Sequence, residues 1–301
     1  MLPAYWLLLA IYFLIPTWRE IESPAPLWKY LTFTQNLGLD TVNNRTFSHA
    51  WSLCIEEQFY LALPLALVAL KGTLNLRRLI WGVVCLMLVG LAVRWVSWQL
   101  FVQPALVAGT DGSPRWSREW ATWIYYPTQC RLDGLLTGVL VAGVFRWRPK
   151  VRAWTDRRPL VFLGFGILLL GAGWVLGSPM VGYSCALFGY PVISGAFGAF
   201  LICVISPSFR LPKPIYVPIK WIAVLSYAVY LTHKIAGHVL QPWLTRLGFS
   251  PQGWPMFGAL LAGCLLVGLV VHLLIERPSF WMRDRLLRRR QTPRVPRTGV
   301  C

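Results

Sequence analysis

The feature that most constrains the fold of this chain is a series of eight apolar runs, separated by short polar or basic segments. Most are long enough for a helix to cross the hydrocarbon core of a bilayer, which takes about 20 residues, although the first is short for a span. In lipid, backbone polar groups must be satisfied within the segment, so such runs predict helices. We therefore predict an all-α, polytopic transmembrane helix bundle, with runs at 2–16, 49–70, 79–102, 123–145, 160–176, 183–205, 221–240 and 256–275.

Composition agrees with a membrane protein, because 56% of the 301 residues are hydrophobic and only 13% are charged. A net charge of +18 could indicate a nucleic-acid partner, but the basic residues form short clusters between the apolar runs, which is the positive-inside pattern. We expect membrane lipids and no nucleic acid as partners. The basic segment 146–158 and both termini are predicted to be cytoplasmic, and 17–48 and 103–120 to lie outside. The expected domains are a membrane-embedded bundle, 1–281, and a basic, disordered tail, 282–301.

One stretch places ionisable groups at the start of an apolar helix, and the rest of the chain is organised around it. His49, Glu56 and Tyr60 are spaced so that a helix beginning near His49 would put all three on one face, with Glu57 beside it. A carboxylate in a spanning segment costs roughly 2.5 to 3.5 kcal/mol, which favours a functional role for Glu56. The alternative is a helix start at the membrane interface, with both acids in water.

Three further polar clusters lie in or beside apolar runs. Arg131 and Asp133 are too close in sequence to share a helical face, so either they pair with groups on other helices or Asp133 caps a helix. Tyr230 and His233 share one helical stripe and could face a common cavity, unless His233 is simply satisfied by a carbonyl group. A third cluster, at 272–276, is interpreted as an ordinary interfacial helix end.

The sequences HAWSLCIEEQFYLALPL, YYPTQCRLDGLLTGVLVA, LSYAVYLTH and IERP occur in that order, and together they resemble the motifs of the acyltransferase 3 family of integral membrane acyltransferases. The resemblance covers nearly the whole chain, from Leu2 to about Trp281. It implies transfer of an acyl group, commonly acetyl from acetyl-CoA, to a hydroxyl of a carbohydrate or another acceptor. It also implies a bundle of about ten helices, of which the first two, including an arginine and a histidine central to catalysis, have no match here.

From this resemblance we expect an acyltransferase of the bacterial inner membrane. Glu56 would orient or assist a base, Arg131 and Asp133 would help to form a polar cavity, and His233 and Tyr230 would donate hydrogen bonds near the reacting centre. His49 and Glu57 complete the candidate set. Acyl-CoA is the expected donor, with a carbohydrate or small-molecule acceptor, no bound cofactor and no metal. A transporter or flippase for a lipid-linked glycan, or an inactive fragment, are the alternatives.

Overall fold

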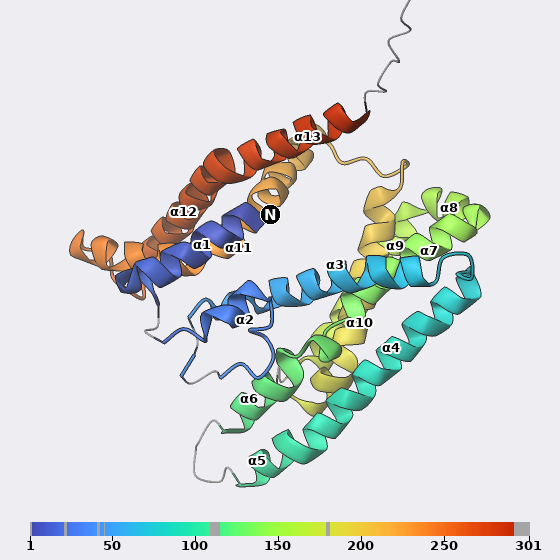
Figure 1. Cartoon of the computed structure of the whole chain (residues 1–301), viewed down its shortest axis with the longest axis horizontal. Helices are drawn as coiled ribbons and strands as arrows, with labels where there is room; N and C mark the ends of the chain where they lie inside the picture. Colours follow the sequence, from blue (N-terminus) through green and yellow to red (C-terminus); the bar gives the residue numbers. More distant parts are fainter. Residues whose placement is uncertain are drawn as a thin grey trace, which may run out of the picture. The chain divides into compact units, whose positions relative to one another are not determined.

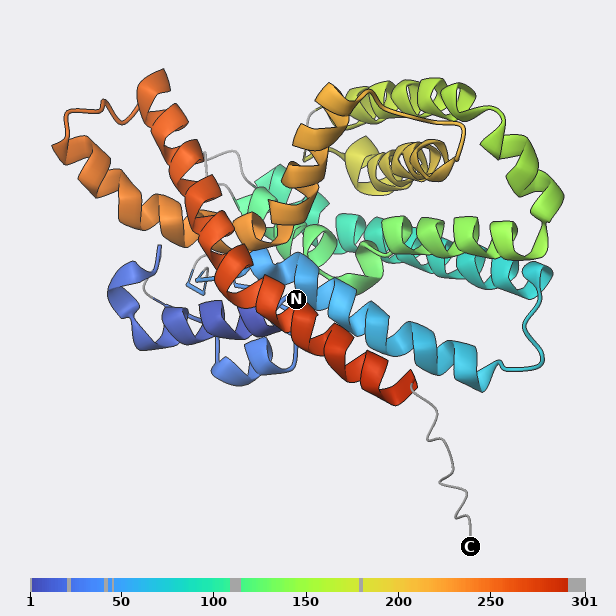
Figure 2. The same cartoon turned by 90° about the horizontal axis from the view of Figure 1, so that it is seen from above.

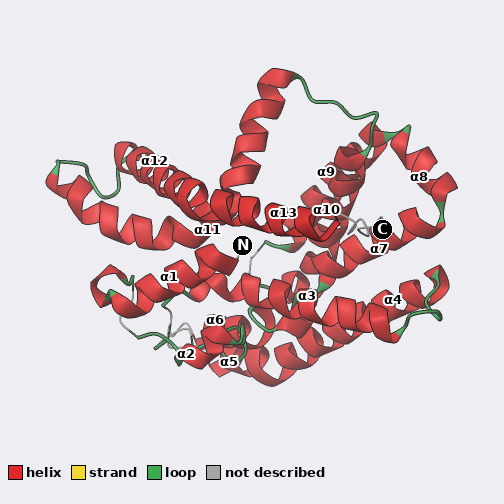
Figure 3. Ribbon diagram, turned by 45° about the horizontal axis from the view of Figure 1, so that its top comes forward, coloured by secondary structure: helices red, strands yellow, loops and turns green. Residues whose placement is uncertain are grey.

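The computed structural model describes residues 2–20, 23–40, 43–44, 46–108, 115–178 and 181–291. Within this part of the chain every regular element is a helix and none is a strand, which confirms the predicted fold class (Figure 3). Among the described residues, six helices are long and apolar enough to cross a membrane. The chain is therefore a multi-pass membrane protein. Two of the eight predicted runs form shorter helices, α1 (Leu2–Leu14) with 13 residues and α7 (Asp133–Trp147) with 15.

The helices divide into two compact units, and the single membrane-embedded bundle expected from the sequence stays a prediction. The first unit combines the two ends of the chain, Met1–Glu22 and Pro212–Cys301, and the second comprises Ser23–Leu211. The division after Leu211 falls in a proline-rich connector, where proline removes backbone donors and prevents a helix from continuing.

In the first unit, α11 (Lys213–Arg246) and α12 (Trp254–Val271) lie side by side (Figure 1). Their backbones approach closely at Gly268, where an added Cβ would overlap Val229 of α11. A π-helical turn then leads from α12 into α13 (Arg277–Gln291). The predicted disordered tail thus begins with ten helical residues, 282–291, because this segment is rich in good helix formers such as Arg and Leu. Residues 292–301 lie outside the described part of the chain.

In the second unit, α7 packs along α4 (Leu76–Ser97), as Figure 2 shows. Helix α10 (Tyr190–Ile205) packs along both α7 and α9 (Pro159–Leu176). An added Cβ on Gly143, near the end of α7, would overlap Leu79, near the start of α4. The two helices are therefore antiparallel. The other helices of this unit are α2 (Leu27–Leu31), α3 (Trp51–Ala69), α5 (Gln103–Ala108), α6 (Arg115–Trp120) and α8 (Pro149–Asp156).

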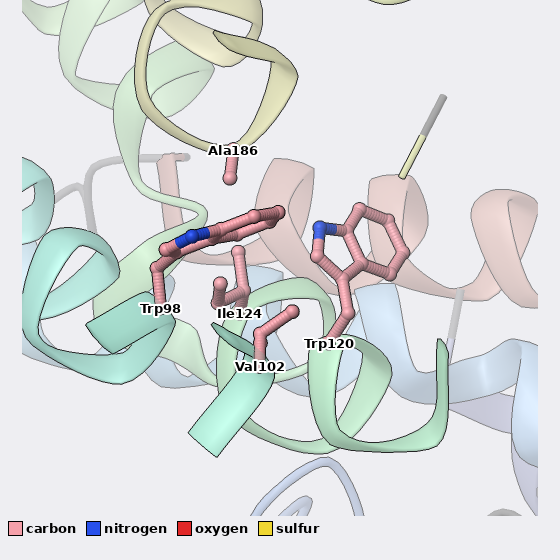
Figure 4. Packing of buried hydrophobic residues seen from close by; sticks show 5 residues of the cluster. All are labelled: Trp98, Val102, Trp120, Ile124 and Ala186. Atoms are coloured by element: carbon pink, nitrogen blue, oxygen red, sulfur yellow. The ribbon is translucent and has the colours of Figure 1, made fainter. Parts of the chain in front are cut away.

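The antiparallel pairing of α4 and α7 fixes where the charges lie. The basic segments 71–78 and 146–158 meet at one end of this unit, because the first runs into the start of α4 and the second begins at the end of α7. The start of α7 and the end of α4 meet at the other end, about 20 Å away along α7. At that end, a buried cluster of Trp98, Val102, Trp120, Ile124 and Ala186 joins the segment after α4, the segment after α6 and the turn before α10 (Figure 4).

Candidate functional site

At the end of the second unit opposite the basic segments, Arg94 of α4 and Asp133 of α7 form a buried ion pair. Arg94 Nη1 donates to Asp133 Oδ2 at 2.6 Å and to the Cys130 carbonyl oxygen at 2.7 Å, and Arg94 Nη2 faces Asp133 Oδ1 at 3.4 Å. The two side chains are only 1% and 5% exposed. Gly90 permits this approach, because a Cβ there would lie 2.8 Å from the Gln129 carbonyl oxygen. Of the two arrangements that the sequence left open for Asp133, pairing across helices is the observed one, since Asp133 makes no capping bond.

Arg131 lies beside this pair in a different environment. Its guanidinium carbon stands 4.0 Å from the ring centre of Tyr190, 5.1 Å from that of Tyr125 and 5.4 Å from that of Trp51. Among the residues that the structure describes, no carboxylate forms an ion pair with it, and its buried Nη1 has no hydrogen-bond partner. Arg94 also faces the Tyr190 ring, at 5.7 Å. Two cations therefore share one ring, and Asp133 neutralises only one of them.

A polar network joins α3 to the segment that precedes Arg131 in the chain. Thr128 Oγ1 donates to Gln58 Oε1 at 2.6 Å and accepts from Asn36 Nδ2 at 2.8 Å. Gln58 Nε2 in turn donates to Asn36 Oδ1 at 3.1 Å and to the Phe33 carbonyl oxygen at 2.6 Å. The network ties the loop before α3 to α3 itself and to the segment before α7. Because its three side chains satisfy one another, it holds the Arg131 segment in place rather than offering free groups to a ligand.

The start of α3 differs from the prediction in one respect. The helix begins at Trp51, and His49 lies in a buried 3-10 turn before it, Ser48–Ala50. The turn follows Phe47, a fully buried residue whose φ of 53° lies in the left-handed region, at a typical cost of about 1 to 3 kcal/mol. The expected helical stripe from His49 to Tyr60 is therefore wrong, because His49 precedes the helix. Tyr60 is also 52% exposed.

Glu56 and Glu57 are both partly buried on α3. Among the described residues neither forms an ion pair. The buried face of this helix is formed by Leu53, Cys54 and Ile55, and Glu56 follows it directly. Arg131 lies against Trp51, the first residue of α3, so Trp51 links the helix of Glu56 to Arg131. Five of the seven predicted site residues belong to this unit, namely His49, Glu56, Glu57, Arg131 and Asp133.

Tyr230 and His233 belong to the first unit, on α11. Nδ1 of His233 is 2.8 Å from the Tyr230 carbonyl oxygen, and the two rings are 6.1 Å apart. A carbonyl oxygen can only accept a hydrogen bond, so Nδ1 carries the proton and Nε2 is the basic nitrogen of the neutral ring. The carbonyl contact agrees with the structural alternative for His233.

The first unit also contains a pair that the sequence interpretation treated as interfacial. His272 Nδ1 lies 2.6 Å from Glu276 Oε2 across the π-helical turn, and the two side chains are 12% and 3% exposed. Within the described residues no group of three His, Cys, Asp or Glu side chains could hold a metal ion.

Comparison with known proteins identifies the family. The family described as an acyltransferase domain matches residues 1–273. The chain belongs to this acyltransferase family. It is 29% identical over 239 residues to the protein named "Putative peptidoglycan O-acetyltransferase YrhL" of Bacillus subtilis (strain 168), covering 76% of this chain and 34% of that relative.

A second relative is the peptidoglycan O-acetyltransferase OatA of Listeria monocytogenes serovar 1/2a (strain ATCC BAA-679 / EGD-e), 30% identical over 188 residues. That match covers 61% of this chain and 27% of the relative. The chain thus spans about a third or less of the curated relatives that it matches. No solved structure matches it.

Sequence reasoning missed several residues of this candidate site. Arg94 could have been found, because it is the single charge within the apolar run 79–102, and a charge inside a span is expected to have a partner. Tyr190 and Tyr125 carried no such signal, since aromatic residues are common at both membrane interfaces. Gln58 bonds to one residue that is 22 positions away in the sequence and to another that is 70 positions away. No local sequence pattern predicts contacts over such separations.

Proposed function

We propose that the chain transfers an acyl group, most simply acetyl, from acyl-CoA to a hydroxyl of a cell-envelope carbohydrate. Family membership supports acyl transfer, and the printed names of both relatives describe O-acetylation of peptidoglycan. The single structural observation that carries the proposal is Arg131, a partly buried cation that forms an ion pair with no described carboxylate. A site that binds negatively charged substrate groups needs a cation that is not already neutralised. A purely structural buried arginine is instead expected to be paired with a carboxylate.

In the proposed reaction the acceptor oxygen attacks the thioester carbonyl carbon, and the acceptor loses its proton to a base. The tetrahedral intermediate then expels the thiolate of coenzyme A, which takes up a proton. Glu56 assists the base at the start of α3, and Arg131 holds an anionic part of the substrate against the rings of Trp51, Tyr125 and Tyr190. Asp133 acts indirectly, because it is committed to Arg94 and so fixes the segment that presents Arg131.

The donor approaches from the basic end of the second unit. A cavity of about 480 Å³ extends between α3, α4 and α7, with Arg78 lining it at the basic end and Gln58 and Thr128 lining it toward the site. In our proposal the phosphates of coenzyme A bind near Arg78, beside Lys71 and Arg77, and the acyl end extends along this cavity. His49, in the turn before α3, and Glu57, on α3 itself, support the site from the same unit.

This mechanism sets an orientation for the chain. The basic end must face the cytoplasm, where acyl-CoA is found, so the Arg131 end faces the opposite side of a bacterial inner membrane. The segment 146–158 is then cytoplasmic, and we propose the same side for both termini from the positive-inside pattern of the sequence. Labelling of intact cells tests this, because a cysteine in place of Trp154, an exposed residue of α8, should react only after the membrane is permeabilised.

The activity is tested by measuring release of coenzyme A from acetyl-CoA by the purified protein in lipid nanodiscs, with and without a peptidoglycan-derived acceptor. We expect acceptor-dependent release in the wild type. Arg131→Gln should lower the rate by about 100-fold, the usual loss when one positioned charged donor is removed from an active site. Arg118→Gln is the matched control, because Arg118 is exposed at the same end of the unit, and it should keep the wild-type rate.

Three outcomes would contradict the proposal. Absence of release from the folded wild type with any acyl donor or acceptor would leave no transferase activity to explain. Equal rates in the Arg131 and Arg118 variants would remove Arg131 from the site. Movement of a lipid-linked glycan across the membrane without release of coenzyme A would favour the transporter alternative.

A further inference from the structure

The last helix of the first unit, α13, combines two properties that suit neither water nor hydrocarbon alone. Its sequence, RPSFWMRDRLLRRRQ, contains six arginines and one acid, Asp284. Its large apolar side chains are nevertheless exposed, since Trp281 and Leu286 are each 60% exposed, Met282 58% and Leu287 51%. Hydrocarbon would make every arginine costly, and water would leave the apolar side chains uncovered. The boundary between the two satisfies both kinds of side chain.

The place of α13 in the chain agrees with this boundary. Helix α12 and the π-helical turn after it contain 18 and five residues, which together are long enough to cross the hydrocarbon core. Helix α13 follows that turn directly (Figure 1). The buried pair of His272 and Glu276, 2.6 Å apart, fixes the turn from which α13 leaves. The arginine-rich helix therefore begins where the spanning segment reaches the membrane surface.

A groove of about 500 Å³ lies along one face of α13, between it and the start of α1 at Pro3. The wall that α13 contributes has the spacing of a single helical face and consists of Ser279, Met282, Arg283, Leu286 and Leu287. Three of these side chains are apolar. The fourth large one, Arg283, is 61% exposed, so its guanidinium reaches the surrounding solvent. The groove thus has an apolar wall and carries a cation at its edge.

The positive charge of this helix is not cancelled within the helix. Arg283 donates to Asp284 Oδ1 from Nε at 2.9 Å and from Nη2 at 2.8 Å, but an exposed ion pair of this kind contributes little stability, so a phosphate can join or replace it. Arg277 and Arg285 are exposed on another face, one turn before and one turn after Trp281. Among the described residues neither of them forms an ion pair.

These features are complementary to one class of molecule. A phospholipid with a net negative charge offers a hydrocarbon chain to an apolar groove and a phosphate that guanidinium groups bind well. A soluble anion would leave the apolar wall uncovered, and at the membrane surface lipid headgroups are the nearest anions. We propose that α13 lies on the membrane surface and binds an anionic phospholipid, with the phosphate at Arg283 and one chain in the groove beside Pro3.

The inference concerns the surface of the first unit and does not depend on the proposed function. Phosphatidylglycerol is the probe, and phosphatidylcholine, which has no net charge, is the control lipid. The purified full chain is placed in nanodiscs that contain equal amounts of both lipids, and in each experiment one of them carries a photoactivatable group in its chain. Mass spectrometry then maps the labelled peptides. Labelling of α12 by the same lipid is the internal reference for ordinary contact with the bilayer.

Relative to this reference, phosphatidylglycerol should label 277–287 at least about fivefold more than phosphatidylcholine does, the effect of one arginine near an anionic surface. Arg283→Gln should lower this preference about fivefold, and Arg283→Lys, which keeps the charge, should retain most of it. Arg246→Gln is the matched control, because Arg246 is exposed in the same unit but at the end of α11, on the turn that leads to the start of α12. It should leave the preference unchanged.

Several results would overturn the inference. Equal labelling of 277–287 by the two lipids, or labelling of α12 without any labelling of α13, would remove the lipid from this surface. Equal losses in Arg283→Gln and Arg246→Gln would show a response to total charge instead of a site on α13. If Arg283→Gln does not fold, the wild type decides, because a preference based on exposed charges should largely disappear at about 1 M salt, where the screening length is about 3 Å. A preference that survives this salt concentration would contradict the assignment to the arginines.

Discussion

Arg94 and Arg131 face the same tyrosine ring, yet their surroundings differ in one decisive way. Arg94 forms two contacts with the carboxylate of Asp133 and a third with a backbone carbonyl, so its charge is neutralised inside the protein. Arg131 is held by ring faces alone, which orient a guanidinium without cancelling its charge. The first arrangement fixes α4 to α7. The second keeps a positive charge available for something that the chain itself does not supply.

The same distinction applies to the acids. Glu276 is buried and lies 2.6 Å from His272, so its charge has a partner within the first unit. Glu56 is only partly buried, and no described residue forms an ion pair with it. A buried partner indicates a structural role, and an ionisable group without an ion-pair partner is a candidate for chemistry or binding. The predictions below test this rule on the described residues.

The largest effect is expected from removing Arg94. Arg94→Met leaves the buried Asp133 carboxylate without a counter-charge, which should lower the free energy of unfolding by about 3 to 5 kcal/mol. Arg131→Met leaves no carboxylate unpaired and should cost less than about 1 kcal/mol. Thermal unfolding in detergent, followed by near-UV circular dichroism, compares the two variants.

A double variant provides the control for this comparison. Arg94→Met combined with Asp133→Leu removes both charges and should regain most of the lost stability, since well-packed apolar replacements of a buried pair are often neutral. Equal instability of the Arg94 and Arg131 single variants would contradict the distinction between paired and unpaired cations.

The second effect concerns catalysis. Glu56→Gln should reduce acyl transfer by about 100-fold or more with little loss of folded protein, whereas Glu57→Gln should be much milder. The reason is that Glu56 directly follows the buried face of α3 and has no structural ion pair to lose. Rates of coenzyme A release by the two variants decide it, and full activity in both would exclude Glu56 from the site.

A somewhat smaller loss is expected at His233. His233→Ala should lower the rate by about 10- to 100-fold, because the basic Nε2 of a positioned imidazole is removed. His233→Gln, which keeps a hydrogen-bonding group, should retain more activity than alanine if hydrogen bonding rather than proton transfer is required. A wild-type rate in His233→Ala would leave His233 with only its structural contact to the Tyr230 carbonyl oxygen.

The smallest effect is expected in the polar network. Thr128→Val leaves Gln58 Oε1 without its donor and should cost about 1 to 2 kcal/mol of stability. Thr73→Val is the matched control, because its exposed hydroxyl bonds only to the Leu70 carbonyl oxygen and water can replace that bond. If both threonine variants unfold at the wild-type temperature, the network does not hold the Arg131 segment.

Local patterns were sufficient to predict the helical membrane fold, because apolar runs bounded by basic clusters have few other solutions in a bilayer. They were also sufficient to single out Glu56, Arg131 and Asp133, since charge near a span is costly wherever it occurs. They failed at His49, where a left-handed Phe47 starts a turn before the helix, and at the tail, where α13 continues to Gln291.

The sequence by itself determined that this chain crosses a membrane as helices and that a few ionisable residues near its apolar runs need an explanation. Only the tertiary structure decided which of these residues form ion pairs with one another. Arg94 lies 39 residues from its partner Asp133, and Arg131 owes its ring contacts to α3, α10 and the segment before α7. Charge pairing depends on distances of a few ångströms between helices, and helix packing rather than sequence spacing sets those distances.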